Sequence, residues 1–135
     1  MGVHVTWDND EKTAIRYDLA GRWTWDEFFP VYQQATQMIA PLEYKVEFIV
    51  NLADEVTQKG FVPPNLLSRL SDLNKHQPPN VGATYVVGVP FLKVLYNVAV
   101  KVYPVMAERY VYVTSLEEAR QLIALKVNRN AKLNA

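Results

Sequence analysis

The sequence predicts an α/β domain with a mixed β-sheet, in which an opening antiparallel hairpin precedes parallel strands and about four helices. Three short strand-to-helix junctions carry this prediction, at residues 21–27, 87–92 and 112–119. Parallel neighbours need crossover connections, and helices that follow strands this closely supply them. Half of the 135 residues are hydrophobic, which favours one core. We expect one domain over residues 1–128 and a polar C-terminal tail over residues 129–135.

The hairpin is predicted from two runs in which apolar and polar residues alternate. Their apolar members are Val3, Val5 and Trp7, followed by Ile15, Tyr17 and Leu19. Alternation of this kind is typical of a half-buried strand, and the turn-forming Asp8-Asn9-Asp10 lies between the runs.

The first helix is predicted to begin near Thr24. Thr24 and Glu27 fit a capping box, and Trp23 and Phe28 have the spacing of a hydrophobic staple. Pro30 predicts a bent first turn or a later start. One apolar face follows the helical period, through Phe28, Tyr32, Ala35, Ile39 and Leu42.

The central strand is predicted over residues 45–52, where the nearly continuous apolar run is typical of a strand covered on both faces. Residues 53–64 form a long predicted loop, and a connection of that length is often functional. Asn65 fits the cap of a second helix, whose apolar face carries Leu66, Leu67, Leu70 and Leu73.

A further strand is predicted over residues 83–89, and Pro90 suits the first turn of the third helix. Apolar residues surround almost the whole of that helix, so either other elements enclose it or it covers a partner or an apolar ligand. The last strand is predicted over residues 109–113. A final helix follows, capped either by Thr114 with Glu117 or by Ser115 with Glu118.

Composition excludes several classes of function. The 14 basic and 14 acidic residues balance, without a basic run, which disfavours a nucleic-acid partner. Cysteine is absent, so thiolate chemistry is excluded and a reducing cytoplasm fits. The start resembles no secretory signal, and two prolines divide the apolar segment 83–107, so we expect a cytoplasmic protein without an integral membrane segment. We expect no metal and no cofactor, because His4 and His76 are the only histidines and have no partners at ligand spacing.

The order of elements resembles the STAS fold of bacterial anti-sigma-factor antagonists, the SpoIIAA-like family. The residues that carry the likeness are those of segments 20–24, 49–52 and 111–119, with Leu122 and Ile123. The resemblance implies a non-enzymatic regulatory module that acts through a protein partner or as a homodimer.

The chain departs from the family at its phosphorylation site. Phosphorylated members carry a serine just before the second helix, where the chain has Gly60-Phe61-Val62-Pro63-Pro64-Asn65. No serine occupies that corner, and two prolines remove amide donors, so the serine switch is not carried over. Thr57 is expected to be an exposed loop residue without a role in phosphorylation.

Two candidate sites follow. The resemblance implies a partner surface on the 53–65 loop and the second helix, with Asp54, Glu55, Thr57, Asn65 and Ser68. The alternative is a pocket for a lipophilic small molecule near the third helix, a site suggested also by a likeness in fold to the lipid-binding lobe of the CRAL-TRIO family. Its predicted residues are Phe91, Leu95, Val98, Ala99 and Tyr103.

The interior and surface should distinguish these functions. An interaction module predicts a packed interior with exposed apolar area, and a carrier predicts an apolar cavity. An enzyme that uses Asp54 and Glu55 as acids would need a polar cleft at the strand ends, and we do not expect one.

Overall fold

The protein folds around one five-stranded mixed sheet with strand order β1-β2-β3-β4-β5. The computed structural model describes the backbone of residues 2–134 and their side chains, apart from those of Glu55, Gln58 and residues 129–134. β1 and β2 are antiparallel and the other pairs are parallel, so the predicted α/β fold is confirmed, and it is consistent with a STAS-like arrangement. The strands are β1 (Val3–Trp7), β2 (Ala14–Leu19), β3 (Val46–Asn51), β4 (Val81–Val87) and β5 (Tyr110–Val113).

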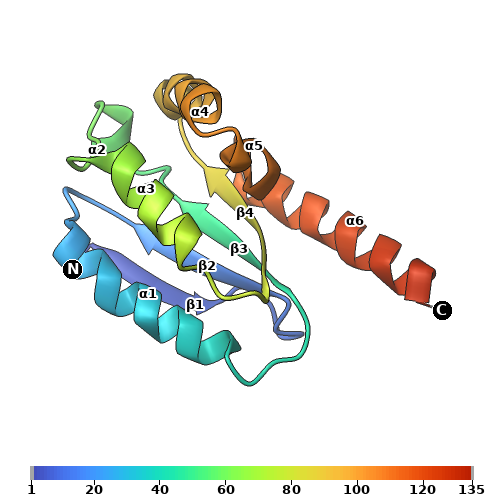
Figure 1. Cartoon of the computed structure of the whole chain (residues 1–135). Helices are drawn as coiled ribbons and strands as arrows, with labels where there is room; N and C mark the ends of the chain where they lie inside the picture. The colour runs from blue at the N-terminus through green and yellow to red at the C-terminus, as the bar shows by residue number, and fades with distance from the viewer. Residues whose placement is uncertain (1, 135) are drawn as a thin grey trace.

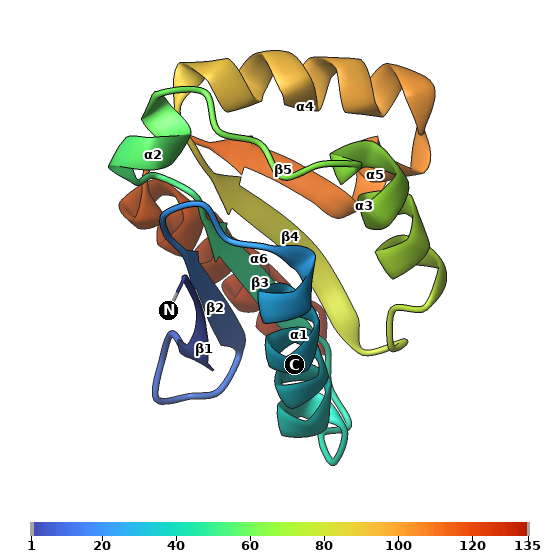
Figure 2. The same ribbon diagram turned by 90° about the vertical axis from the view of Figure 1, so that its left-hand side faces the viewer.

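The helices lie on both faces of the sheet. One face is covered by α1 (Trp25–Ile39), α3 (Leu66–Lys75), α4 (Pro90–Val102) and the short α5 (Val105–Arg109), and the other by α6 (Leu116–Asn134), as Figures 1 and 2 show. Each parallel strand lies beside the strand that precedes it in the sequence, so the sheet grows in one direction only. Because the crossover connections are right-handed, the connecting helices all lie on the same face of the sheet. Because α6 follows the last strand, it is free to cross the opposite face.

The two faces enclose different cores. On the α1 face, Ile15 and Tyr17 pack with Phe28 and Phe48. On the α6 face, Ile49 packs with residues of β4, β5 and α6. The first four residues of β3 are buried, which confirms that this strand is covered on both sides.

The predicted helix starts are largely confirmed. Thr24 and Glu27 form the capping box of α1, and the rings of Trp23 and Phe28 lie 5.9 Å apart. Pro30 lies within α1, where its missing N–H affects a carbonyl of the first turn only. Of the two caps considered for α6, Ser115 is used: its hydroxyl accepts from the N–H of Glu118.

Several boundaries differ from the prediction. The 53–64 segment contains a short helix, α2 (Glu55–Gln58), and α5 was not predicted. β4 begins and ends two residues before the predicted strand. α6 continues to Asn134 and so covers most of the segment that we expected to be a polar tail. Asn65 precedes α3 with a positive φ of 60°, but its side chain makes no capping bond.

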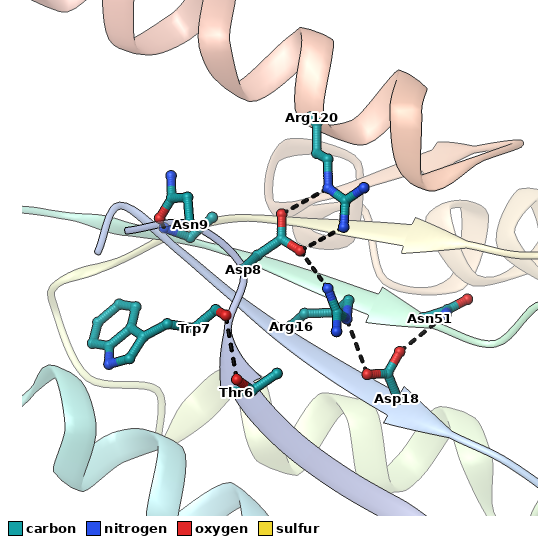
Figure 3. A network of polar contacts seen from close by, with 9 residues as sticks. Thr6, Trp7, Asp8, Asn9, Arg16, Asp18, Asn51 and Arg120 are labelled. Atoms are coloured by element: carbon teal, nitrogen blue, oxygen red, sulfur yellow. Dashed lines mark hydrogen bonds and ion pairs between the residues drawn. The ribbon is translucent and has the colours of Figure 1, made fainter. Parts of the chain in front are cut away.

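A network of charged side chains fastens α6 to the opening hairpin (Figure 3). The carboxylate of Asp8 is 3% exposed and contacts Arg16 at 2.6 Å and Arg120 at 2.9 Å. Arg16 also contacts Asp18, which accepts from Asn51. Burial alone would raise the pKa of Asp8, but the hydrogen bonds from Arg120 and Arg16 outweigh it and lower that pKa. The network therefore links α6 to β1, β2 and β3.

Candidate functional site

An apolar cavity of about 150 Å³ lies between the sheet and the helices of the α1 face. Its walls include Tyr17 of β2, Phe48 of β3, Phe28 of α1, Leu70 of α3 and Leu95 of α4. No charged side chain is among its lining residues in the described part of the chain. Engineered apolar cavities of about this size in other proteins bind benzene, so the space is large enough for a small apolar molecule.

The sequence leaves this space open because the helices above it pack loosely. α3 contributes no fully buried residue, and α4 buries only Leu92 and Ala99. Beneath them, β4 presents Thr84 and Val86, whose short side chains do not fill the gap. A cavity therefore persists between β4 and the covering helices.

Two tyrosine hydroxyls in the cavity wall have no hydrogen-bond partner among the described residues, those of Tyr17 and Tyr32. Two other polar groups of the wall are paired: the indole N–H of Trp25 donates to Pro64 O at 2.7 Å, and Tyr96 Oη donates to Tyr110 O at 2.9 Å. Buried polar groups are nearly always paired in native proteins, so the two free hydroxyls mark the cavity as unusual.

These phenols stay protonated at neutral pH. Burial raises the pKa of Tyr17, and the neighbouring Tyr32 and Tyr110 raise it further. Burial also raises the pKa of Tyr32, and it raises that of Tyr110 to about 12. At neutral pH, Tyr17 and Tyr32 are therefore hydrogen-bond donors without an acceptor among the residues that the structure describes.

The predicted ligand-binding residues of α4 are divided between its two sides. Leu95 and Ala99 line the cavity. Phe91 and Val98 point outward and are 40% and 45% exposed. Tyr103 packs against the buried cluster around Ala99 without lining the cavity.

The outward side of α4 is an exposed apolar stripe. Phe91, Val94, Val98 and Val102 recur at helical spacing, and all four are at least 40% exposed. Val105 of α5 extends the stripe. Contiguous apolar surface of this kind is typical of an interaction site.

The predicted partner residues that the structure describes differ in exposure. Asp54 accepts from the N–H of Gly21 at 2.8 Å and from the hydroxyl of Thr57 at 2.8 Å, so it joins two loops of the chain. The expectation of an exposed Thr57 was wrong, because that residue is 2% exposed and its hydroxyl is directed at Asp54. Asn65 and Ser68 are exposed together at the start of α3. The side chain of Glu55 lies outside the described part of the structure.

The hydrogen bonds of Asp54 also affect its acidity. Burial would raise the pKa of Asp54, but the hydrogen bonds from Gly21 and Thr57 outweigh it and lower that pKa. No group of three potential metal ligands occurs among the side chains that the structure describes. No helix in the described part of the chain is both long and apolar enough to cross a membrane.

Sequence reasoning missed most of the cavity wall. Trp23, Phe28 and Tyr32 were assigned only to the start and the apolar face of the first helix, and Tyr17 only to a strand. Met106 comes from a segment for which no element was predicted. One signal was available in the sequence. Tyr17 lies on the apolar face of its strand, where a buried hydroxyl needs a hydrogen-bond partner, and the neighbouring residues on that face, Ile15 and Leu19, are apolar.

The fold and cavity define the chain as an α/β domain with an apolar interior site. Comparison with models of protein families, with curated proteins and with solved structures finds no match. The STAS-like family, inferred from sequence, is accordingly kept as a proposal.

Proposed function

We propose that the protein binds a small apolar molecule in the cavity between its sheet and α1, α3 and α4. The observation that carries this proposal is a cavity of about 150 Å³ with an apolar, uncharged wall. An empty apolar cavity lowers the free energy of unfolding in proportion to its volume, because the side chains that line it lack van der Waals contacts. A ligand that fits the cavity would supply those contacts and so would bind favourably.

The loose packing of α3 and α4 supports the same proposal. A ligand must enter, and helices with few buried residues open more readily than those that form the core. α3 is the more suitable cover by this criterion, because it contributes no fully buried residue, whereas α4 buries Leu92 and Ala99.

The test is a titration with toluene followed by protein NMR, with variants on the two sides of α4. Ala99→Leu adds bulk at the cavity wall and should abolish toluene-induced shifts. Val98→Phe adds comparable bulk on the outward, 45% exposed side and should leave them intact. If toluene causes no shifts in the wild-type protein, or causes the same shifts in both variants, the cavity is not a binding site.

A second candidate function is favoured by the exposed stripe on α4. The resemblance to bacterial STAS-like proteins suggests a non-enzymatic, cytoplasmic regulatory module that pairs with a second copy of itself, and the absence of cysteine is in keeping with a cytoplasmic location. The stripe supports this candidate because two such surfaces can cover each other.

Sedimentation equilibrium tests the second candidate. A wild-type dimer that Val94→Glu converts to a monomer would support it, because Val94 is 62% exposed and its substitution leaves the core untouched. Leu125→Glu is the matched control, since Leu125 is 61% exposed on α6 instead. A wild-type monomer at high concentration would contradict the candidate.

A further inference from the structure

The wall of the cavity between the sheet and α1, α3 and α4 differs in composition from one set of elements to the other. α3 and α4 supply mainly leucines, among them Leu70 and Leu95. β2, β3 and the segment 23–32 supply aromatic rings instead. These rings belong to Tyr17, Trp23, Trp25, Phe28, Tyr32 and Phe48. A ligand in the cavity would therefore contact both aromatic rings and aliphatic side chains.

The aromatic rings form a cluster around Phe28. The ring of Tyr17 lies 5.5 Å from that of Phe28, and the ring of Tyr32 lies 6.1 Å from it. Trp25 lies 5.7 Å away, with its plane at 87° to that of Phe28. Aromatic rings attract one another at such separations, and a well-placed pair is worth more than its buried area alone. Phe28 and Trp25 each remain 8% exposed and line the cavity, so the cluster can accept a further ring there.

The polar atoms of these rings are not offered to the cavity. The hydroxyl oxygens of Tyr17 and Tyr32 are inaccessible to solvent, so the two residues contribute ring carbons to the wall. The indole N–H of Trp25 already donates to Pro64 O. No charged side chain lines the cavity in the described part of the chain, so an ionised ligand would lose its hydration without gaining a counter-charge. The wall therefore favours a ligand that is neutral and makes few hydrogen bonds.

We infer that the ligand is a neutral aromatic molecule, whose ring packs on Phe28 and its neighbours and whose short alkyl substituent reaches the leucines of α3 and α4. The inference rests on the proposed function and adds the chemical class of the ligand. The volume of about 150 Å³ limits the enclosed part to about one ring with such a substituent. An aliphatic molecule of the same size would bury a similar area but would lack the contacts between rings.

Benzene and cyclopentane test the inference, because they are similar in volume and differ in aromatic character. Their dissociation constants are measured by NMR titration for the wild-type protein and for Phe28→Leu, which replaces the central ring by an aliphatic side chain. We expect the affinity ratio to shift about three- to tenfold toward cyclopentane in the variant, which is the value of one contact between rings. Both probes gain the space that the variant leaves, so the ratio reports the loss of the ring. Benzoate should bind neither protein.

Leu95→Met is the matched control, because it alters an aliphatic part of the wall at nearly constant volume. The affinity ratio should remain at its wild-type value. Tyr32→Leu provides a second measurement if Phe28→Leu does not fold, since Tyr32 is only partly buried. We expect it to shift the ratio in the same direction as Phe28→Leu.

Failure of the ligand class is distinguishable from failure of the cavity function. If neither benzene nor cyclopentane binds, both are overturned. If the two probes bind but the ring variants leave their affinity ratio unchanged, or if Leu95→Met shifts it as far as Phe28→Leu does, the ligand class is overturned and the cavity function stands. Benzoate that binds as tightly as benzene would overturn the neutral class in the same way.

Discussion

Two chemically identical substitutions in the cavity wall should change stability in opposite directions. Tyr17→Phe removes a buried hydroxyl without a partner among the described residues, whereas Tyr96→Phe removes one that donates to Tyr110 O at 2.9 Å. In the first case the rings of Phe28 and Phe48, at 5.5 and 5.8 Å, keep their contacts. The decisive difference is the hydrogen-bonding state of the hydroxyl, although Tyr17 is also more deeply buried than Tyr96.

The magnitudes follow from the cost of an unpaired polar group. A buried unsatisfied group costs about 1–3 kcal/mol, so Tyr17→Phe should raise the free energy of unfolding by about 1–2 kcal/mol. Tyr96→Phe should lower it by about 1 kcal/mol, because it removes the hydrogen bond to the carbonyl of Tyr110. For a chain of 135 residues, 1 kcal/mol corresponds to a shift in melting temperature of roughly 3–4 °C.

Urea unfolding, followed by tryptophan fluorescence, gives the free energy of unfolding of the wild-type protein and of both variants. An unchanged slope of that free energy with urea concentration shows that the folded and unfolded states expose the same surface in all three proteins. Thermal unfolding gives an independent value. If Tyr17→Phe lowers the free energy of unfolding as much as Tyr96→Phe does, the hydroxyl of Tyr17 is paired in solution and the reasoning is refuted.

Three further predictions concern the polar contacts of the fold. Arg120→Met should lower the free energy of unfolding by about 1 kcal/mol at neutral pH, since Arg120 is half exposed. The lowered pKa of Asp8 means that its contribution is present above pH 3.8 and is lost as the pH falls through the folded-state value, so urea unfolding of wild type and Arg120→Met should converge in acid. Gly82→Ala should cost about 2 kcal/mol in the same assay, because the new Cβ would lie 2.7 Å from a Glu47 carboxylate that Lys126 and Ala83 hold in place. Asp54→Ala should lower the melting temperature by several degrees, measured by calorimetry, because two loops lose their common acceptor.

The sheet and its crossovers were predictable because the responsible signals are local. Alternation placed Val3, Val5 and Trp7 correctly, and the continuous apolar run of β3 revealed a strand covered on both faces. The capping box at Thr24 is likewise a pattern of neighbouring residues. Short helices such as α2 carry no comparable pattern, since four residues are too few to show a period.

The candidate site was less predictable because it depends on contacts distant in sequence. The pattern of α4 identified an apolar helix but did not distinguish Leu95, which faces the cavity, from Val98, which faces outward. When a helix is apolar on both sides, its sequence alone does not show which side faces the core. Thr57 was misplaced for a similar reason, because its burial depends on Asp54 and the short helix α2.

The energetics of the interior connect the fold to its proposed use. At about 24 cal/mol per Å³, an empty cavity of about 150 Å³ costs about 4 kcal/mol, and two unpaired hydroxyls cost about 1–3 kcal/mol each. These costs are comparable with the whole net stability of a domain, about 5–15 kcal/mol. Replacing Tyr17 by phenylalanine would remove the cost of one hydroxyl. Filling the cavity would remove the cost of the empty space, but it would also remove the space that a ligand would occupy. A ligand that fits the cavity would offset the cost of the empty space, so stability and binding should vary in opposite directions among variants that fill it.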